Sequence, residues 1–187
     1  MVGTWDGARD FERAPRPANP GRDRYGNTTW FYLYSDSVDH DPSKYHLLPF
    51  FAVLAPEWEV WRSRDSGLSG GQTGYNNGQI SMHPGHYNLG QNAILGWRSP
   101  IASTVSVTAS IGPPPQSTCD VPANGVLWSI DQDSRTLLSG AVSPGGATAH
   151  PELTATVEAG ETLYVVINDA GDSNCDTTLV SLAVETL

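Results

Sequence analysis

Aromatic and polar side chains gather between residues 57 and 90, in a pattern that suits a flat, hydroxyl-rich ligand. Residues 57–61 read Glu-Trp-Glu-Val-Trp, and the alternation of a β-strand places Trp58 on one face and Trp61 on the other. One tryptophan can therefore be buried while the other faces water, and Trp61, beside Arg62, is the better candidate for exposure. An exposed indole can pack on the apolar C–H face of a sugar, while polar neighbours bind its hydroxyls.

The glycine-rich segment 63–90 follows this strand and supplies more side chains of the same kind. Irregular segments of this length are uncommon in compact domains and frequently carry function. Packing is the alternative for the aromatic residues, because large aromatic side chains dominate cores. The candidate ligand-binding residues are Trp61, Arg62, Tyr75, Asn76, Asn77, His86 and Tyr87.

Two glutamates raise the alternative of catalysis. Glu57 and Glu59 share a strand face, with Cα atoms roughly 6.5 to 7 Å apart, and paired carboxylates hydrolyse glycosidic bonds. Such carboxylates flank the scissile bond, so two residues of one strand are weak evidence for a sandwich-fold glycoside hydrolase. A polysaccharide lyase that uses Tyr87, His86 and Arg98 is a further alternative, although their order gives it little support. Non-catalytic binding is therefore favoured.

Aspartates crowd two loops in numbers that could hold a hard cation. Asp169, Asp172 and Asp176 form one group, and a second lies within residues 36–41. Calcium prefers several oxygen ligands, so a structural calcium ion is the cofactor that these groups allow. Neither group has the fixed spacing of the twelve-residue calcium loop. A solvated acidic turn is the alternative, since aspartate favours turns.

The two cysteines, Cys119 and Cys175, lie in separate polar, turn-rich segments. No further metal-ligand pattern surrounds them, so one disulfide is favoured over a metal site. In the chain-entropy model, closing so long a loop stabilises a domain by about 4 kcal/mol. A disulfide indicates a secreted, extracellular protein, and two free thiols in the cytosol are the alternative.

Composition excludes several partners. The chain has 187 residues and a formal charge of −10, with its 10 Lys and Arg residues scattered. A nucleic-acid-binding protein would carry a basic stripe, and the negative charge also disfavours anionic membranes. We therefore expect neither nucleic acid nor membrane as a partner, and no run of about 18 apolar residues could span a bilayer.

The elements that position these side chains are predicted to be strands. Apolar residues alternate with polar ones from about residue 91, and turns rich in Gly, Pro and Asn separate the runs. A period of two with regular turns indicates antiparallel strands, each of which buries one row of side chains against a second sheet. We predict an all-β fold, an antiparallel two-sheet β-sandwich of the jelly-roll type. The alternating rows lie within residues 93–97, 105–111, 126–130, 153–157, 163–167 and 180–184.

The N-terminal part differs in texture from the rest. Residues 1–29 are polar and rich in Pro, Arg and Gly, which predicts an irregular N-terminal wrap. The apolar run 30–34 then begins a strand. Residues 30–187 are therefore predicted to form a single β-sandwich domain.

Three segments, residues 92–100, 124–130 and 157–167, also resemble a known class of domain. The stretch from about residue 76 to 187 is similar to ancillary jelly-roll modules, carbohydrate-binding or carbohydrate-binding-like, of secreted bacterial polysaccharide-degrading enzymes. This resemblance implies a non-catalytic domain attached to other domains in a longer chain, with a polysaccharide or oligosaccharide partner and often a structural calcium ion. It carries over no sugar-binding residue. A structural spacer module of a secreted protein is the other alternative.

Overall fold

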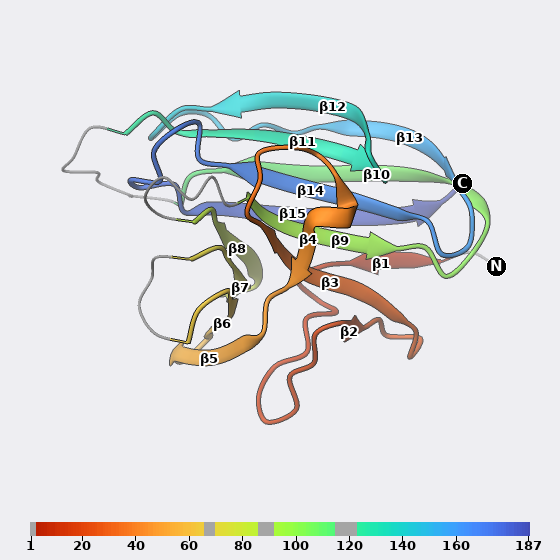
Figure 1. Ribbon diagram of the computed structural model, residues 1–187. Coiled ribbons are helices and arrows are strands. Elements are labelled where there is room, and N and C mark those ends of the chain that lie inside the picture. The colour runs from red at the N-terminus through yellow and green to blue at the C-terminus, as the bar shows by residue number, and fades with distance from the viewer. Residues whose placement is uncertain (1–2, 66–69, 86–91, 115–122) are drawn as a thin grey trace.

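Two antiparallel sheets face each other in the computed structural model (Figure 1), which describes residues 3–65, 70–85, 92–114 and 123–187. A short 3₁₀ helix, η1 (Pro42–Lys44), precedes β4. No helix in these ranges is long and apolar enough to cross a bilayer. Sheet A has the order β13 (Glu152–Val157), β10 (Ser103–Gly112), β15 (Thr178–Thr186), β8 (Gln79–His83), β7 (Gln72–Asn76), β6 (Trp58–Arg62), β5 (Phe50–Ala55), and β1 (Thr4–Asp6) also pairs with β15. Sheet B has the order β12 (Arg135–Val142), β11 (Val126–Gln132), β14 (Thr162–Asn168), β9 (Asn92–Arg98), β3 (Thr28–Ser35), β2 (Gly21–Arg22), and β4 (Tyr45–Leu47) also pairs with β3.

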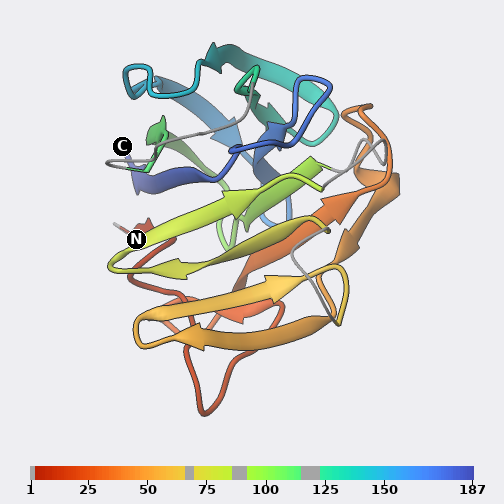
Figure 2. The ribbon, with the colours of Figure 1, turned by 90° about the vertical axis from the view of Figure 1, so that its left-hand side faces the viewer.

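The strands from β8 to β15 pair as a nested hairpin that is rolled into two layers. β11 pairs with β12, β10 with β13, β9 with β14 and β8 with β15. The pairs β11–β14 and β10–β15 then complete the two sheets. This arrangement is a jelly roll, so the predicted fold class is confirmed. β5, β6 and β7 extend sheet A beyond β8, side by side (Figure 2).

The core consists of the alternating rows that the sequence pattern indicates. Trp97, Val107, Ile130 and Ile167 are all fully buried, and each belongs to a different strand of the roll. Burying a large apolar side chain contributes roughly 1.5–3 kcal/mol, so these rows dominate the stability of the sandwich. Ser106 and Thr108, between the buried rows of β10, remain partly exposed, as one-sided burial requires.

The N-terminal segment is tied to this core through buried tryptophans. Trp5 Nε1 donates to Asp23 Oδ2 at 2.7 Å, and Trp30 Nε1 donates to Asp10 Oδ2 at 3.2 Å. A buried indole N–H needs such a partner, and each carboxylate comes from a connecting loop. The segment predicted as an irregular wrap thus contains two short strands, β1 and β2, joined by loops that hold buried side chains. The domain boundary at residue 29 stays a prediction.

Gly74 in β7 should tolerate no side chain. A Cβ at this position would lie 2.7 Å from Val60 Cα and closer still to the Glu59 carbonyl oxygen, both backbone atoms of β6. Gly74→Ala is expected to destabilise the protein by about 2 kcal/mol or more, because the pair β6–β7 must move apart. Urea unfolding measures this. Gly78→Ala is the control. A Cβ added there would have nothing within 4 Å, so the cost of this variant comes from the backbone alone, whose φ is +87°. A Gly74→Ala cost below that of Gly78→Ala would contradict the expectation.

Candidate functional site

A cleft of about 140 Å³ lies on the outer face of sheet A. Ile80 and Met82 of β8 point into the core, so Ser81 and His83 between and beyond them point outward. β6 and β7 continue this outer face, since Trp58 pairs with Asn76 and Gln72 pairs with His83. The residues that line the cleft are Trp58, Val60, Gln72, Ser81, His83 and Thr177.

Trp58 is the aromatic side chain that this cleft offers to a ligand. Its exposed fraction is 37%, whereas Val60, on the same face of β6, is 3% exposed. Gln72 and Ser81 are also nearly buried, at 7% and 8%, so their polar groups lie in a recess and not on an open surface. An indole wall beside recessed amide, hydroxyl and imidazole groups matches the chemistry of a sugar, apolar on one face and polar at its edges.

The prediction that Trp61 is the exposed tryptophan is wrong. Its exposed fraction is 9%, and it packs on the Phe51 ring with centroids 5.1 Å apart. The alternation along β6 is as predicted, but Trp61 lies on a covered face, and Trp58 is the tryptophan of this strand that remains exposed. The physical reason is that the N-terminal segment covers this face. The ring centroids of Phe11 and the half-buried Tyr75 are 6.0 Å apart, and the Arg13 guanidinium lies 4.5 Å from the Tyr75 ring centroid. Trp61 and Tyr75 share that covered face.

Glu57 and Glu59 bind an arginine instead of flanking a cleft. Arg13 Nη1 donates to Glu57 Oε2 at 2.9 Å, and Arg13 Nε donates to Glu59 Oε1 at 3.1 Å. The hydrogen bond with Glu57 is the main reason why the pKa of Arg13 is raised. The nearly buried Glu59 also accepts from the Ala14 backbone N–H at 2.8 Å. These contacts give both carboxylates a structural role. The glycoside hydrolase alternative therefore no longer has the pair of catalytic carboxylates on which it depended.

The other predicted ligand-binding residues are only partly brought together. Asn76 lies beside Trp58 on the outer face, and Arg62 lies there too, donating from Nη2 to the Asp65 carbonyl at 2.8 Å. Asn77 sits in the β7–β8 turn with φ +48°, and its amide donates to Asn76 Oδ1 at 3.0 Å. His86 and Tyr87 lie outside the described residues.

Sequence reasoning noted His83 in the glycine-rich segment but missed three other residues of the cleft: Gln72, Ser81 and Thr177. They are brought together by strand pairing, since β7 and β8 set Gln72 opposite His83. The signal that could have found them is the alternation in residues 79–83, where two apolar residues mark the inward row.

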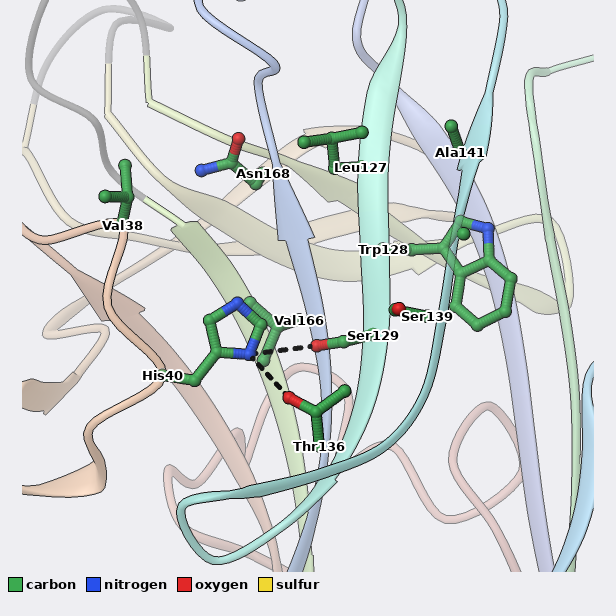
Figure 3. Close-up of a pocket in the computed structure, with 11 residues that line it drawn as sticks. Val38, His40, Leu127, Trp128, Ser129, Thr136, Ser139, Ala141, Val166 and Asn168 are labelled. Atoms are coloured by element: carbon green, nitrogen blue, oxygen red, sulfur yellow. Dashed lines mark hydrogen bonds between the residues drawn. The ribbon is translucent and has the colours of Figure 1, made fainter.

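A larger cavity, about 580 Å³, lies on the outer face of sheet B (Figure 3). The loop that leads to η1 contributes Val38 and His40, and β11, β12 and β14 contribute the remaining walls. Leu127 and Val38 at its rim are 50% and 59% exposed. No sequence pattern pointed to this site, because its lining comes from four separate segments.

His40, Ser129 and Asp131 meet beside this cavity, but not as a catalytic triad. Asp131 Oδ2 lies 2.7 Å from His40 Nδ1, and Ser129 Oγ lies 3.3 Å from the same nitrogen while donating to Asp131 Oδ2 at 3.0 Å. A triad needs the carboxylate on one ring nitrogen and the nucleophile on the other. Here both use Nδ1, so the arrangement orients the imidazole and does not activate the serine.

The loop between β14 and β15 holds one unusual carboxylate, that of Asp176. It is 1% exposed, and neither side-chain oxygen has a hydrogen-bond partner among the described residues. Burial raises its pKa to about 8, and the charges of Asp172 and Asp169 add to the effect. Asp169 and Asp172 accept from backbone N–H groups of their own loop. Within the described part of the chain, no three His, Cys, Asp or Glu side chains form a metal-holding group.

The predicted disulfide falls partly outside the described residues. Cys175 lies in the same loop as Asp176, with φ +61°, and no cysteine in the described ranges is free. Cys119 is not among the described residues, so its pairing with Cys175 stays a prediction.

Comparison with known proteins finds similarity in architecture alone. No family model matches the chain, and no curated protein does. A family 51 carbohydrate-binding module from Clostridium perfringens GH95, in complex with methyl-galactose, is 18% identical over 65% of this chain and 77% of that one, with a TM-score of 0.39. A mutant of the module CBM29-2 complexed with cellulohexaose is 11% identical over 86% and 94%, with a TM-score of 0.41. Pika GITRL is 10% identical over 50% and 76%, with a TM-score of 0.32.

These similarities are those of a sandwich fold. Carbohydrate-binding modules are among the matched structures, as the resemblance noted from the sequence led us to expect. At these identities and TM-scores they carry no argument about the ligand of this chain or the residues that bind it.

Proposed function

We propose that the protein is a non-catalytic carbohydrate-binding module whose site is the cleft on the outer face of sheet A. The observation that carries this proposal is the exposed indole of Trp58 beside recessed polar groups, with Asn76 next to it in register. The paired strands β6, β7 and β8 form the floor of the cleft.

Binding is favoured over catalysis by the state of the carboxylates. A glycosidase needs an acid and a base on two sides of the scissile bond, and none of the described residues that line this cleft is Asp or Glu. Among the described lining residues His83 is the one titratable side chain, and it contacts the Pro84 carbonyl through Nδ1. Sugar recognition needs no such pair.

A polysaccharide screen tests the proposal. The purified chain is incubated with insoluble cellulose, chitin, xylan and mannan, and run in native gels that contain soluble xylan, galactan, mannan or β-glucan. Sedimentation with at least one solid, or retardation in at least one gel, is the expected result. Absence of binding to every polymer, or release of reducing sugar from any of them, would contradict the proposal and favour the spacer or the enzyme alternative.

We also propose that a calcium ion binds at the Asp176 carboxylate. Its two buried oxygens have no hydrogen-bond partner among the described residues and fit a hard cation, and Asp172 and Asp169 raise the negative potential around it. Since no group of three carboxylates converges there in the described residues, backbone carbonyls or water would have to complete the shell. Addition of 5 mM CaCl₂ to chelator-treated protein is expected to raise the Tm by about 5 °C, measured by calorimetry with MgCl₂ as the control. An unchanged Tm would argue against the ion.

We further propose that the protein is secreted and that Cys119 and Cys175 form a disulfide. Material produced in an oxidising compartment should then show no thiol that reacts with Ellman's reagent in denaturant. After reduction it should show two. Reactive thiols before reduction would contradict the pairing, and the argument for secretion would lose its support.

A further inference from the structure

We propose that the cavity on the outer face of sheet B is a second binding site, separate from the cleft on sheet A, for a neutral ring that has one apolar face and hydroxyl groups at its edge. The volume of about 580 Å³ lies within the usual range for small-molecule sites. The proposal stands independently of the proposed function, because the two hollows lie on opposite sheets and share no residue.

The walls of the cavity set the chemistry of its ligand. Leu127, Ala141 and Val166 provide aliphatic surface, and Ser139 provides a hydroxyl on β12. The described residues that line the cavity include no Lys, Arg, Asp or Glu. The described lining therefore supplies no Lys or Arg to balance an anion and no Asp or Glu to balance a cation, which favours an uncharged amphipathic ring.

His40 is the polar group that orients such a ligand. Its Nδ1 lies within hydrogen-bond distance of Asp131, Ser129 and Thr136, which fixes the plane of the ring. Figure 3 shows the other ring nitrogen on the opposite side of the imidazole, toward Val38 and Asn168 and hence toward the cavity. Asp131 is fully buried and acts as a positioning residue, since it holds His40 so that Nε2 faces a ligand.

The floor beneath His40 is rigid, which favours a preformed site. Val166 belongs to a small buried cluster with Leu33 and Ile94 on the outer face of sheet B. Asn168 is held on both ends of its amide, because Nδ2 donates to Asn92 Oδ1 at 2.8 Å and Oδ1 accepts from the Ala170 N–H. The free-energy cost of ordering these walls when a ligand binds is therefore small.

Sugars and phenols both present this chemistry, and the experiment separates them. Amide chemical shifts of the full chain are followed by NMR during titration with the methyl glycosides of glucose, galactose, xylose and N-acetylglucosamine, and separately with phenol. The expected result is a saturable shift at the amides of Leu127, Ser139 and Val166 with one of these probes. Saturation by a glycoside identifies a sugar site, and saturation by phenol alone identifies an aromatic one. No shift at these amides with any probe at 50 mM would overturn the proposal.

Variants at two positions test the assignment of the site. Ser139 is exposed on the edge strand β12, so Ser139→Phe should fill the cavity without disturbing the core and weaken binding more than ten-fold, while Ser139→Ala should leave it within two-fold. His40→Asn keeps an amide near the Nδ1 position and removes Nε2, with an expected loss of about five-fold. Trp58→Ala should leave these shifts unchanged, which distinguishes this site from the cleft. Persistence of the shifts in Ser139→Phe would overturn the proposal.

Discussion

Trp58→Ala is expected to abolish retardation of the protein by whichever polysaccharide the screen selects. Removal of a half-exposed indole that stacks on a sugar costs at least ~2 kcal/mol, a loss of about 30-fold in affinity. Because Trp58 is 37% exposed, its truncation should leave the Tm within a few degrees. Affinity electrophoresis of the variant, run beside the parent protein at several polymer concentrations, measures the ratio of dissociation constants.

Two control variants sharpen this test. Trp58→Phe retains a smaller aromatic face and should bind with intermediate affinity. Val53→Ala truncates another exposed apolar side chain, 56% exposed on the adjacent strand β5, but on the face that Glu59 shares, so binding should stay as in the parent protein. Equal retardation of Trp58→Ala and the parent protein would remove the cleft from consideration. Equal losses in Trp58→Ala and Val53→Ala would point to a general effect on β5 and β6.

The sandwich could be predicted because one-sided burial leaves a trace in the sequence. Val105, Val107 and Ala109 are buried while Ser106 and Thr108 between them are partly or fully exposed, and this period of two is a property of the strand itself. The pairing order of the jelly roll left no such trace. It depends on contacts between strands far apart in sequence, such as β8 with β15, which the alternation within each strand does not encode.

The site was harder to predict because alternation separates two faces but does not say which is covered. In β6 the pattern distinguishes Trp58 from Trp61 correctly, yet the covered face depends on Phe11 and Arg13, some 45 residues earlier. Arg13 of the same segment also lies over the Tyr75 ring and forms an ion pair with Glu59. Long-range partners of this kind determine which aromatic side chain remains available for a ligand, and nothing local to residues 57–61 encodes them.

Asp176→Asn is expected to stabilise the chelator-treated protein on the order of 5 kcal/mol at pH 9 and to have little effect near pH 4. The pKa of Asp176 is raised to about 8 in the folded chain by burial and by the neighbouring Asp172 and Asp169, against an unfolded value of about 3.9. Between these values the folded protein binds a proton that the unfolded chain releases, so stability falls as the pH rises from about 4 to 8. An uncharged amide removes this dependence. Urea unfolding in EDTA at one-unit pH intervals measures it.

Calcium should act on the parent protein in the opposite direction and leave the variant alone. A bound cation compensates the buried charge, so 5 mM CaCl₂ should restore most of the stability that the parent protein loses above pH 7, while Asp176→Asn gains nothing. Asp172→Asn serves as a control, since that side chain accepts a backbone hydrogen bond from Asn174 and should shift the profile less. Parallel pH profiles for the parent protein and Asp176→Asn in EDTA would show that the carboxylate is not held in a buried, charge-repelling site. If instead the profiles diverge as expected and calcium changes neither, protonation alone relieves the buried charge of Asp176 and the proposed ion is excluded.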